Sequence, residues 1–285
     1  MARTRTIFIT GASSGIGLAS AKLFHEKGWN VIATMRTPTA DHELSKYQDR
    51  MLVQRLDLQI LDSIKPAIDE GIKKFSAIDV LLNNAGYGQN GLFEAIPRET
   101  VQEQFDVNLF GLMDVTRAIL PHFRANGCGG VINVSSGAGF WALPMSSMYS
   151  ASKFALEGFT EGLSYELASQ NIFVKSVIPH GGVTSTNFVD RFRNSTAATE
   201  ADIQAVYKDF TAATVKSFSK MIAAAGVSSS DVAAAIFTAA TDGTDQLRYF
   251  IGNDARGFLN ARYTSKSDEE FMKFMRGFFP GVKLD

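Results

Sequence analysis

The segment Thr6-Ile7-Phe8-Ile9-Thr10-Gly11-Ala12-Ser13-Ser14-Gly15-Ile16-Gly17 decides how this chain folds. A short apolar run leads into a glycine-rich loop and an amphipathic helix that we expect over residues 15–27. Glycine lets the backbone turn sharply and approach a phosphate, and the free N–H groups at a helix N-terminus hold an anion. A nucleoside-triphosphate loop would instead need Gly-Lys-Ser/Thr, and no lysine follows before Lys22. The loop therefore predicts a dinucleotide site, whose candidate residues are Gly11, Ser13, Ser14, Gly15, Ile16 and Gly17.

Apolar, strand-like runs alternate with helical patterns along most of the chain. After residues 6–10, the expected strands are 30–34, 51–56, 80–83, 131–135, 173–178 and 247–251. Helical spacing occurs at 61–75, 101–124, 148–169 and 230–241. Such alternation implies right-handed crossovers and a parallel sheet with helices on both faces. The predicted fold class is α/β, a Rossmann-like doubly wound parallel sheet of about seven strands.

The composition excludes several classes of protein. Lys and Arg total 28 against 29 acidic residues, so there is no basic excess for nucleic-acid binding. No apolar run approaches the roughly 20 residues that span a bilayer, and the N-terminus lacks the pattern of a signal peptide. The single cysteine, Cys128, excludes an internal disulfide and a Cys-based zinc site. We expect a cytoplasmic protein with no metal, nucleic-acid or membrane partner.

The length of 285 residues suits one large domain, and we expect residues 1–285 to form a single NAD(P)-binding domain. The stretch 184–226 has helical patches but no clear strand. A long insertion of this kind in a compact domain is commonly functional, so we interpret it as a lid or substrate-binding segment. Residues 254–285 form an aromatic-rich C-terminal extension that we expect to pack on the body or on a partner subunit.

The end of the second strand indicates which dinucleotide binds. An acidic residue there binds the ribose 2′-hydroxyl of NAD, whereas a basic residue accepts the 2′-phosphate of NADP. This chain has Met35-Arg36 and no acid at that place, so Arg36 can pair with a phosphate. The pattern favours NADP(H) over NAD(H). The alternative is that Arg36 is a solvated surface residue.

Tyr149 and Lys153 lie four residues apart at the start of a predicted helix, which places them on one face. Tyrosine is a poor acid–base catalyst at its ordinary pKa of about 10. A nearby ammonium favours the phenolate, so we expect Lys153, together with the charge of an oxidised nicotinamide, to lower the pKa of Tyr149 toward 7. A Tyr-x-x-x-Lys spacing alone is common and is usually structural.

Several motifs together resemble the short-chain dehydrogenase/reductase family, in its single-domain branch. The resemblance covers about residues 5–251, and the order and separation of the motifs match jointly. They are Thr10-Gly11-x-x-x-Gly15-x-Gly17, Asn83-Asn84-Ala85-Gly86, Asn108, Ser135-Ser136, Tyr149-x-x-x-Lys153 and Pro179.

The resemblance implies a role for each matching residue. Tyr149 would be the acid or base, Lys153 would tune it and hold the nicotinamide ribose, and Ser136 would hydrogen-bond the substrate oxygen. Asn108 would organise a water chain to the lysine. The cofactor contacts would be Asp57 and Leu58 at the adenine, Asn83, Asn84, Ala85 and Gly86 beside the ribose, and Val183 and Thr184 at the carboxamide and pyrophosphate.

Structural interpretations of some of these residues stay open. Asn108 fits a buried helix asparagine with satisfied hydrogen bonds, Asp57 a helix cap, and the paired asparagines plain turn formers. The chain also departs from the family after Pro179, where His180 takes the place of the usual glycine. The register of Val183 and Thr184 is uncertain for that reason, and His180 either faces the substrate or is a spectator.

The function predicted from the sequence is a reversible hydride transfer between NADP(H) and a carbonyl or secondary alcohol. The alternatives are an NAD-linked alcohol or hydroxysteroid dehydrogenase and a non-catalytic, redox-sensing nucleotide-binding protein. The intact set of Ser136, Tyr149 and Lys153 speaks against the sensor. By analogy with the family we expect a homodimer or homotetramer that pairs through the helices at 101–124 and 148–169, acting on a small-molecule carbonyl or alcohol substrate.

Overall fold

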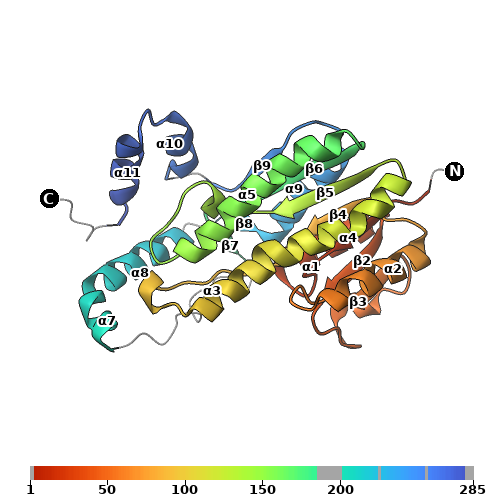
Figure 1. The fold of residues 1–285 in the computed structure, drawn as a ribbon, viewed down its shortest axis with the longest axis horizontal. Coiled ribbons are helices and arrows are strands. Elements are labelled where there is room, and N and C mark those ends of the chain that lie inside the picture. Colours follow the sequence, from red (N-terminus) through yellow and green to blue (C-terminus); the bar gives the residue numbers. More distant parts are fainter. Residues whose placement is uncertain (1–2, 185–200, 224–225, 254–255, 280–285) are drawn as a thin grey trace.

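The computed structural model describes residues 3–184, 201–223, 226–253 and 256–279 (Figure 1). The predicted insertion at 184–226 and the predicted C-terminal extension at 254–285 therefore lie only partly within the described residues. No helix in these ranges is both long enough and apolar enough to cross a membrane.

A seven-stranded, wholly parallel sheet forms the centre, in the order β3-β2-β1-β4-β5-β6-β9. The predicted fold class is confirmed, and each expected strand is present with ends shifted by at most two residues. The strands are β1 (Thr6–Ile9), β2 (Asn30–Met35), β3 (Met51–Arg55), β4 (Val80–Asn83), β5 (Gly129–Val134), β6 (Ile172–Pro179) and β9 (Arg248–Ile251). The direction of winding reverses between β1 and β4, which creates a crevice at the carboxyl ends of the strands.

Helices cover both faces of the sheet, because successive strand side chains point to opposite sides. Ile7 and Ile9 pack with α1 (Gly15–Glu26) and α9 (Ser229–Thr241), whereas Phe8 packs on the opposite face. That face carries α2 (Ile64–Phe75), α4 (Gly111–Ala125) and α5 (Ser147–Ala168). Figure 1 shows α4 and α5 side by side in front of the sheet.

The long helix expected at 101–124 contains a change of helical type. It consists of α3 (Arg98–Phe105), a π-helical turn, η4 (Asp106–Phe110), and α4. A π-turn inserts an extra residue into the helix and is frequent at functional sites. Sequence periodicity did not predict it, since one inserted residue barely alters the apolar pattern. Asn108 sits in this turn.

The remaining elements are short, or gather near the carboxyl edge of the sheet. At the two ends of the predicted insertion, β7 (Val183–Thr184) pairs in parallel with β8 (Val227–Ser228). Between them in the sequence lie α7 (Ala201–Val206) and α8 (Lys208–Ala223). Near the C-terminus come α10 (Phe258–Thr264) and α11 (Asp268–Arg276). Single 3₁₀ turns are η1 (Glu43–Lys46), η2 (Leu61–Ser63), η3 (Phe93–Ala95) and η5 (Gly137–Gly139).

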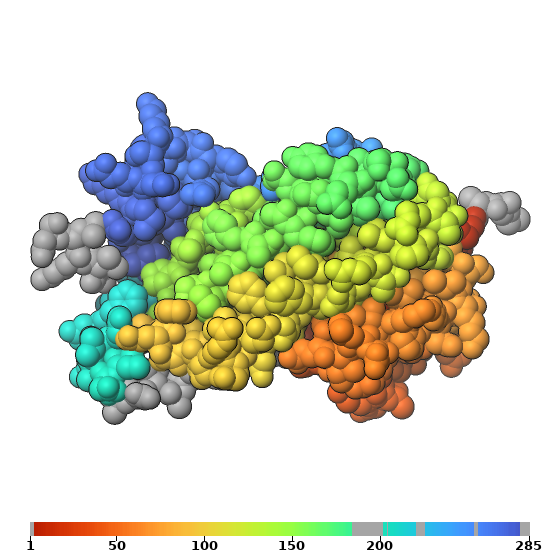
Figure 2. All heavy atoms as spheres, in the orientation of Figure 1, coloured from red at the N-terminus to blue at the C-terminus, as the bar shows by residue number. Residues whose placement is uncertain are grey.

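The two C-terminal helices build a small apolar core of their own around Trp141. This core contains Phe258, Ala261, Phe271 and Met275. In the space-filling view these helices form a blue lobe at one end of the molecule, at the same end as the cyan residues of α7 and α8 (Figure 2). Part of the predicted C-terminal extension thus packs on the body of the domain.

Strand β6 is tied to the helices on both of its faces. On one face Lys175, whose side chain is 4% exposed, donates to Asp242 just after α9 at 2.6 Å. Burial opposes ionisation of Asp242, but hydrogen bonds from Lys175, from the Tyr249 hydroxyl and from the N–H of Thr244 hold the pKa of this carboxyl well below its usual range. On the other face Ser176 donates to Glu157 of α5.

Replacing Asp242 tests how much the first of these ties stabilises the fold. Asp242→Asn leaves the Lys175 ammonium buried without its counter-charge, and breaking such a pair costs about 3–5 kcal/mol. We expect the free energy of unfolding at pH 7 to fall by at least about 2 kcal/mol, measured by urea titration. The matched control is Asp69→Asn, which removes an exposed i,i+4 pair with Lys65 and should change stability by less than about 1 kcal/mol. Equal effects of the two variants would contradict this prediction.

Candidate active site

A cavity of about 840 Å³ opens at the carboxyl ends of the strands. Its walls come from the segments that follow β1, β2, β3, β4, β5 and β6, because parallel strands deliver their carboxyl ends to one edge of the sheet. Of the predicted site residues, those that line it are Gly11, Ser13, Ser14, Gly15, Ile16, Arg36, Asp57, Leu58, Asn84, Ala85, Gly86, Ser136, Tyr149, Lys153 and Val183.

The glycine loop has the backbone that the sequence predicts. Gly11 and Gly15 have φ of +68° and +56°, in the left-handed region that favours glycine. At Gly17 a Cβ would lie 2.3 Å from the carbonyl oxygen of Gly11, so this position supports the loop from beneath rather than lining the cavity. Ser14, the N-cap of α1, makes no side-chain hydrogen bond to the helix. The N–H groups at this helix start are therefore not capped by that hydroxyl and can serve an anion.

The two asparagines at the end of β4, Asn83 and Asn84, have different tasks. Asn84 lines the cavity and donates through Nδ2 to the carbonyl oxygens of Thr10 and Gly11, both at 3.0 Å. It thereby fixes the shape of the glycine loop. Asn83 lies behind the cavity, where its Nδ2 donates to Thr116 and Asn133 at 3.0 Å each. These two contacts join the sheet to α4, which a plain turn-forming asparagine would not do.

Ser136, Tyr149 and Lys153 are brought together by β5 and α5. Ser136 follows β5, and Tyr149 and Lys153 stand one turn apart on α5, 8% and 6% exposed. The Lys153 Nζ lies 5.9 Å from the centroid of the Tyr149 ring and donates to the carbonyl oxygen of Val134 at 3.0 Å. Ser136 and Tyr149 are also hydrogen-bonded to each other. An oxygen of a small molecule could therefore be approached by both hydroxyl groups.

The electrostatics of this group differ from the sequence prediction. Burial raises the pKa of Tyr149 to about 12, opposed by the hydrogen bond with Ser136. Burial likewise lowers the pKa of Lys153 to about 8, while the charge of Glu157 favours the ammonium. The sequence prediction combined Lys153 with the positive charge of an oxidised nicotinamide. In the protein side chains alone, desolvation of the buried phenol is the largest effect, and it acts in the opposite direction.

Asn108 is buried beside this group. Its Oδ1 accepts from the N–H of Tyr87 at 3.0 Å, and its Nδ2 donates to the carbonyl oxygen of Tyr87 at 2.8 Å and to Ser152 at 3.2 Å. A Cβ added at Gly86 would lie 3.1 Å from Asn108 Oδ1 and 3.9 Å from Lys153 Nζ. Asn108 thus neighbours Lys153 and is also a satisfied buried asparagine, so its contacts suit either interpretation.

The opposite end of the cavity carries Arg36, Asp57 and Leu58. Asp57 Oδ1 accepts from the N–H of Gln59 at 3.1 Å, so this carboxylate caps a turn while it lines the cavity. Arg36 borders an adjoining hollow together with Arg55, at the end of β3. Sequence reasoning missed Arg55. Its position follows from the sheet register, in which Met35 is the partner of Arg55, and a single sequence does not reveal that register.

The departure after Pro179 is accommodated by two glycines with positive φ. Gly181 and Gly182 have φ of +77° and +96°, and His180 and Val183 both line the cavity. The ring of His180 stacks edge-on with Trp141 at a centroid distance of 5.9 Å. His180 therefore faces the cavity. The side chain of Thr184 lies outside the described part of the chain.

Sequence reasoning also missed an apolar wall of the cavity. It consists of Trp141, Leu143, Val215, Phe218 and Phe258. These residues come from the loop after β5, from α8 and from α10, and they are far apart in the sequence. Aromatic residues of a C-terminal extension carry no motif that assigns them to a cavity, and the sequence predicted only that the extension packs on the body or on a partner subunit.

The residues of the site fit a nicotinamide dinucleotide. Glycine at position 11 lets the loop pack closely against the segment after β4, since a Cβ at Gly11 would lie 2.8 Å from the Cα of Ala85. The buried hydroxyl of Ser135 lines the same cavity and has no hydrogen-bond partner among the described residues. The described residues hold no cluster of three or more His, Cys, Asp or Glu side chains that could bind a metal ion.

Comparison with known proteins gives the same assignment. Residues 5–197 match the family model for short chain dehydrogenase. The 3-ketodihydrosphingosine reductase of Bacteroides thetaiotaomicron is 39% identical over 184 residues, which are 65% of each protein. Human retinol dehydrogenase 8 is 37% identical over 64% of this chain and 60% of that protein. The aligned part of the chain thus spans slightly less than two thirds of the length of these two relatives.

A solved structure covers more of the chain. The crystal structure of a short-chain dehydrogenase from Streptomyces avermitilis superposes with a TM-score of 0.80 and 32% identity, over 97% of this chain and 99% of that one. The glycine loop, the Ser136-Tyr149-Lys153 group at the sheet edge and these matches agree, and the chain belongs to the short-chain dehydrogenase/reductase family of nicotinamide-dependent oxidoreductases.

Proposed function

We propose that the protein is an NADP(H)-dependent oxidoreductase that interconverts a carbonyl compound and a secondary alcohol, with Tyr149 as the acid or base. One observation carries the proposal. Ser136, Tyr149 and Lys153 line the same cavity as the glycine loop, and Ser136 and Tyr149 are hydrogen-bonded to each other. These residues come from different segments of the chain, and all of them line the cavity at one edge of the sheet.

The chemistry follows from the states of these side chains. Bound NADPH would supply the hydride from its C4, and the oxidised ring would add a positive charge that favours the phenolate. Tyr149, with a raised pKa, is a neutral phenol at neutral pH and can donate its proton to a carbonyl oxygen. Ser136 would hydrogen-bond the same oxygen as negative charge develops on it. In alcohol oxidation Tyr149 takes the proton back, and carbonyl reduction is the direction that a neutral phenol favours.

Two arginines support NADP(H) as the cofactor. Arg36 follows β2 and borders the cavity, and Arg55 shares the adjoining hollow with it. A 2′-phosphate is well served by guanidinium groups, which form paired, charge-assisted hydrogen bonds. NAD(H) dependence, as in an alcohol or hydroxysteroid dehydrogenase, is the second candidate, and the carboxylate of Asp57 in the same cavity is the observation that favours it.

The wider organisation belongs to the same proposal. We place the whole chain in one NAD(P)-binding domain with a substrate-binding insertion at 184–226, acting in the cytoplasm. Self-association through α4 and α5 is supported by aromatic side chains that α5 and the π-turn before α4 expose. Phe110, Phe154 and Tyr165 are 46%, 41% and 73% exposed.

Removing the phenol hydroxyl tests the role of Tyr149. Tyr149→Phe keeps the ring but has no proton to donate, and loss of general acid–base catalysis typically costs 10²–10⁴-fold. We expect kcat for carbonyl reduction to fall by at least about 100-fold, followed by NADPH absorbance, while the Kd for NADPH measured by fluorescence changes little. Tyr165→Phe, an exposed tyrosine on the same helix, is the control and should be silent. Near-normal turnover of Tyr149→Phe would refute the assignment.

Reversing one charge tests the choice of cofactor. In Arg36→Asp the carboxylate repels a 2′-phosphate and can accept from the 2′-hydroxyl of NADH. The ratio of kcat/KM for NADPH to that for NADH should fall by at least about 10-fold, because a hydrogen bond to a charged group contributes about 1.5–3 kcal/mol. Arg98→Asp, an exposed position at the start of α3, controls for the change of net charge. An unchanged ratio in Arg36→Asp would show that Arg36 does not bind the 2′-phosphate of NADPH.

A further inference from the structure

The apolar wall lies at the catalytic end of the cavity. Trp141 packs against Gly137, directly after Ser136, where an added Cβ would lie 2.5 Å from the Trp141 ring. Leu143 precedes Tyr149 by six residues and lines the same cavity. Arg36 and Leu58, which follow β2 and β3, line the opposite end. A substrate whose carbonyl reaches Ser136 and Tyr149 therefore has the remainder of its body next to this wall.

The C-terminal lobe holds part of the wall in place. Phe258, the first residue of α10, lines the cavity and at the same time packs edge-on against Trp141 at 6.0 Å. Both belong to the small core that α10 and α11 build. Arg256 further joins this segment to α8 by donating to the carbonyl oxygen of Lys220 at 3.1 Å. The C-terminal lobe, formed by α10 and α11, thus contributes Phe258 to the wall of the cavity.

Helix α8 closes the wall with one of its faces. Val215, Phe218 and Ser219 are spaced i, i+3 and i+4 and all line the cavity. Val215 is 50% exposed, which leaves an apolar side chain in contact with solvent at the wall. Covering such surface with an apolar ligand is favourable by about 25 cal/mol per Å².

We propose that the substrate is a ketone with an extended apolar body, bound between the C-terminal lobe and α8. The inference rests on the proposed function, and it assigns a role to the aromatic extension. Apolar contact of the body with this wall is the same in the ground state and in the transition state. A longer apolar body should therefore lower KM and leave kcat nearly unchanged.

A homologous series of methyl ketones from four to twelve carbons tests the proposal, with NADPH oxidation as the readout. Each methylene that is buried should raise kcat/KM by about three- to fourfold. Phe258→Ala should lower kcat/KM for the long ketones by about 10-fold or more and kcat/KM for the four-carbon ketone by much less. Because Phe258 also belongs to a core, Val215→Asn, at a half-exposed position, serves as the second variant and should raise KM for the long ketones only.

Tyr263→Ala, an exposed residue of α10, is the matched control for both variants. Two results would overturn the proposed substrate class and leave the oxidoreductase function intact. One is a kcat/KM that does not depend on chain length, and the other is a change of KM in Val215→Asn that is the same for short and long ketones. Turnover of no carbonyl in the series, in the presence of tight NADPH binding, would instead count against the proposed function itself.

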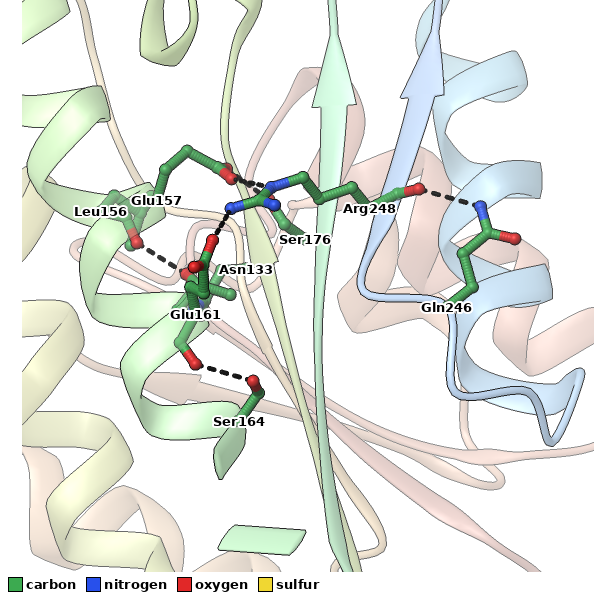
Figure 3. A network of polar contacts seen from close by, with 9 residues as sticks. Asn133, Leu156, Glu157, Glu161, Ser164, Ser176, Gln246 and Arg248 are labelled. Carbon is green, nitrogen blue, oxygen red and sulfur yellow. Dashed lines mark hydrogen bonds and ion pairs between the residues drawn. The ribbon is translucent and has the colours of Figure 1, made fainter. Parts of the chain in front are cut away.

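A second, independent observation concerns the helix that carries the catalytic pair. Ser176 of β6 and Arg248 of β9 are register partners, and both donate to the carboxylate of Glu157, at 2.6 and 2.9 Å. Figure 3 shows this network, in which Arg248 also binds Glu161. Glu157 is 5% exposed and stands one turn after Lys153 on α5.

These contacts of Glu157 lie where α5 packs closely against the turn that follows Ser136. A Cβ added at Gly139 would lie 3.0 Å from the carbonyl oxygen of Lys153 and 3.1 Å from Cγ of Glu157. We infer that Glu157, held by Arg248, is a positioning residue that keeps Lys153 in place and protonated. Two titratable groups face Lys153, namely Tyr149 and Glu157. Two charged groups lie around the Glu157 carboxylate, namely Arg248, which binds it, and Glu161, which binds the same guanidinium.

The pH profile of kcat/KM tests this role. Burial lowers the pKa of Lys153 and the charge of Glu157 raises it, so Glu157→Gln should move the alkaline limb to lower pH by about 0.5 unit or more. Glu166→Gln, at an exposed position on the same helix, should leave the profile unchanged. A Glu157→Gln variant with reduced stability but an unshifted profile would show a purely structural role and overturn the inference.

Discussion

The buried contact between the Lys153 ammonium and the carbonyl oxygen of Val134 fixes the geometry of the site. It joins α5 to the end of β5 at 3.0 Å, and so it brings the helix that carries Tyr149 to the loop that carries Ser136. An ammonium in a buried place is costly unless charges and hydrogen bonds compensate. The carbonyl of Val134 and the carboxylate of Glu157 provide that compensation, and Arg248 in turn balances Glu157. Catalytic placement and sheet stability therefore share one chain of polar contacts.

The sequence predicted the parts of the fold that depend on local pattern. All seven strands were found, because runs that are apolar on both faces are characteristic of strands covered on both sides. The glycine loop was found from its place between a strand and a helix. Tyr149 and Lys153 were found from their spacing on one helix face together with the other motifs that resemble the family. These predictions needed no knowledge of what lies next to the residues in space.

What the sequence did not predict depends on contacts between distant segments. Arg55 joins Arg36 only through the register of β2 and β3, and Phe258 joins Trp141 only because the C-terminal helices fold back over the sheet edge. The pKa of Tyr149 is the clearest case. The sequence shows the neighbouring lysine but not the degree of burial, and burial decides the direction of the shift.

The C-terminal lobe links the specificity of the site to the stability of the chain. Phe258 cannot be exchanged for a polar residue without exposing the small core that it shares with Trp141, Phe271 and Met275. The same ring is part of the cavity wall. A change that alters the preferred substrate at this position therefore also loosens the packing of the lobe, whereas Val215 on α8 is half exposed and free of that coupling. For this reason we expect that substitutions which change substrate specificity with little loss of stability occur first along α8.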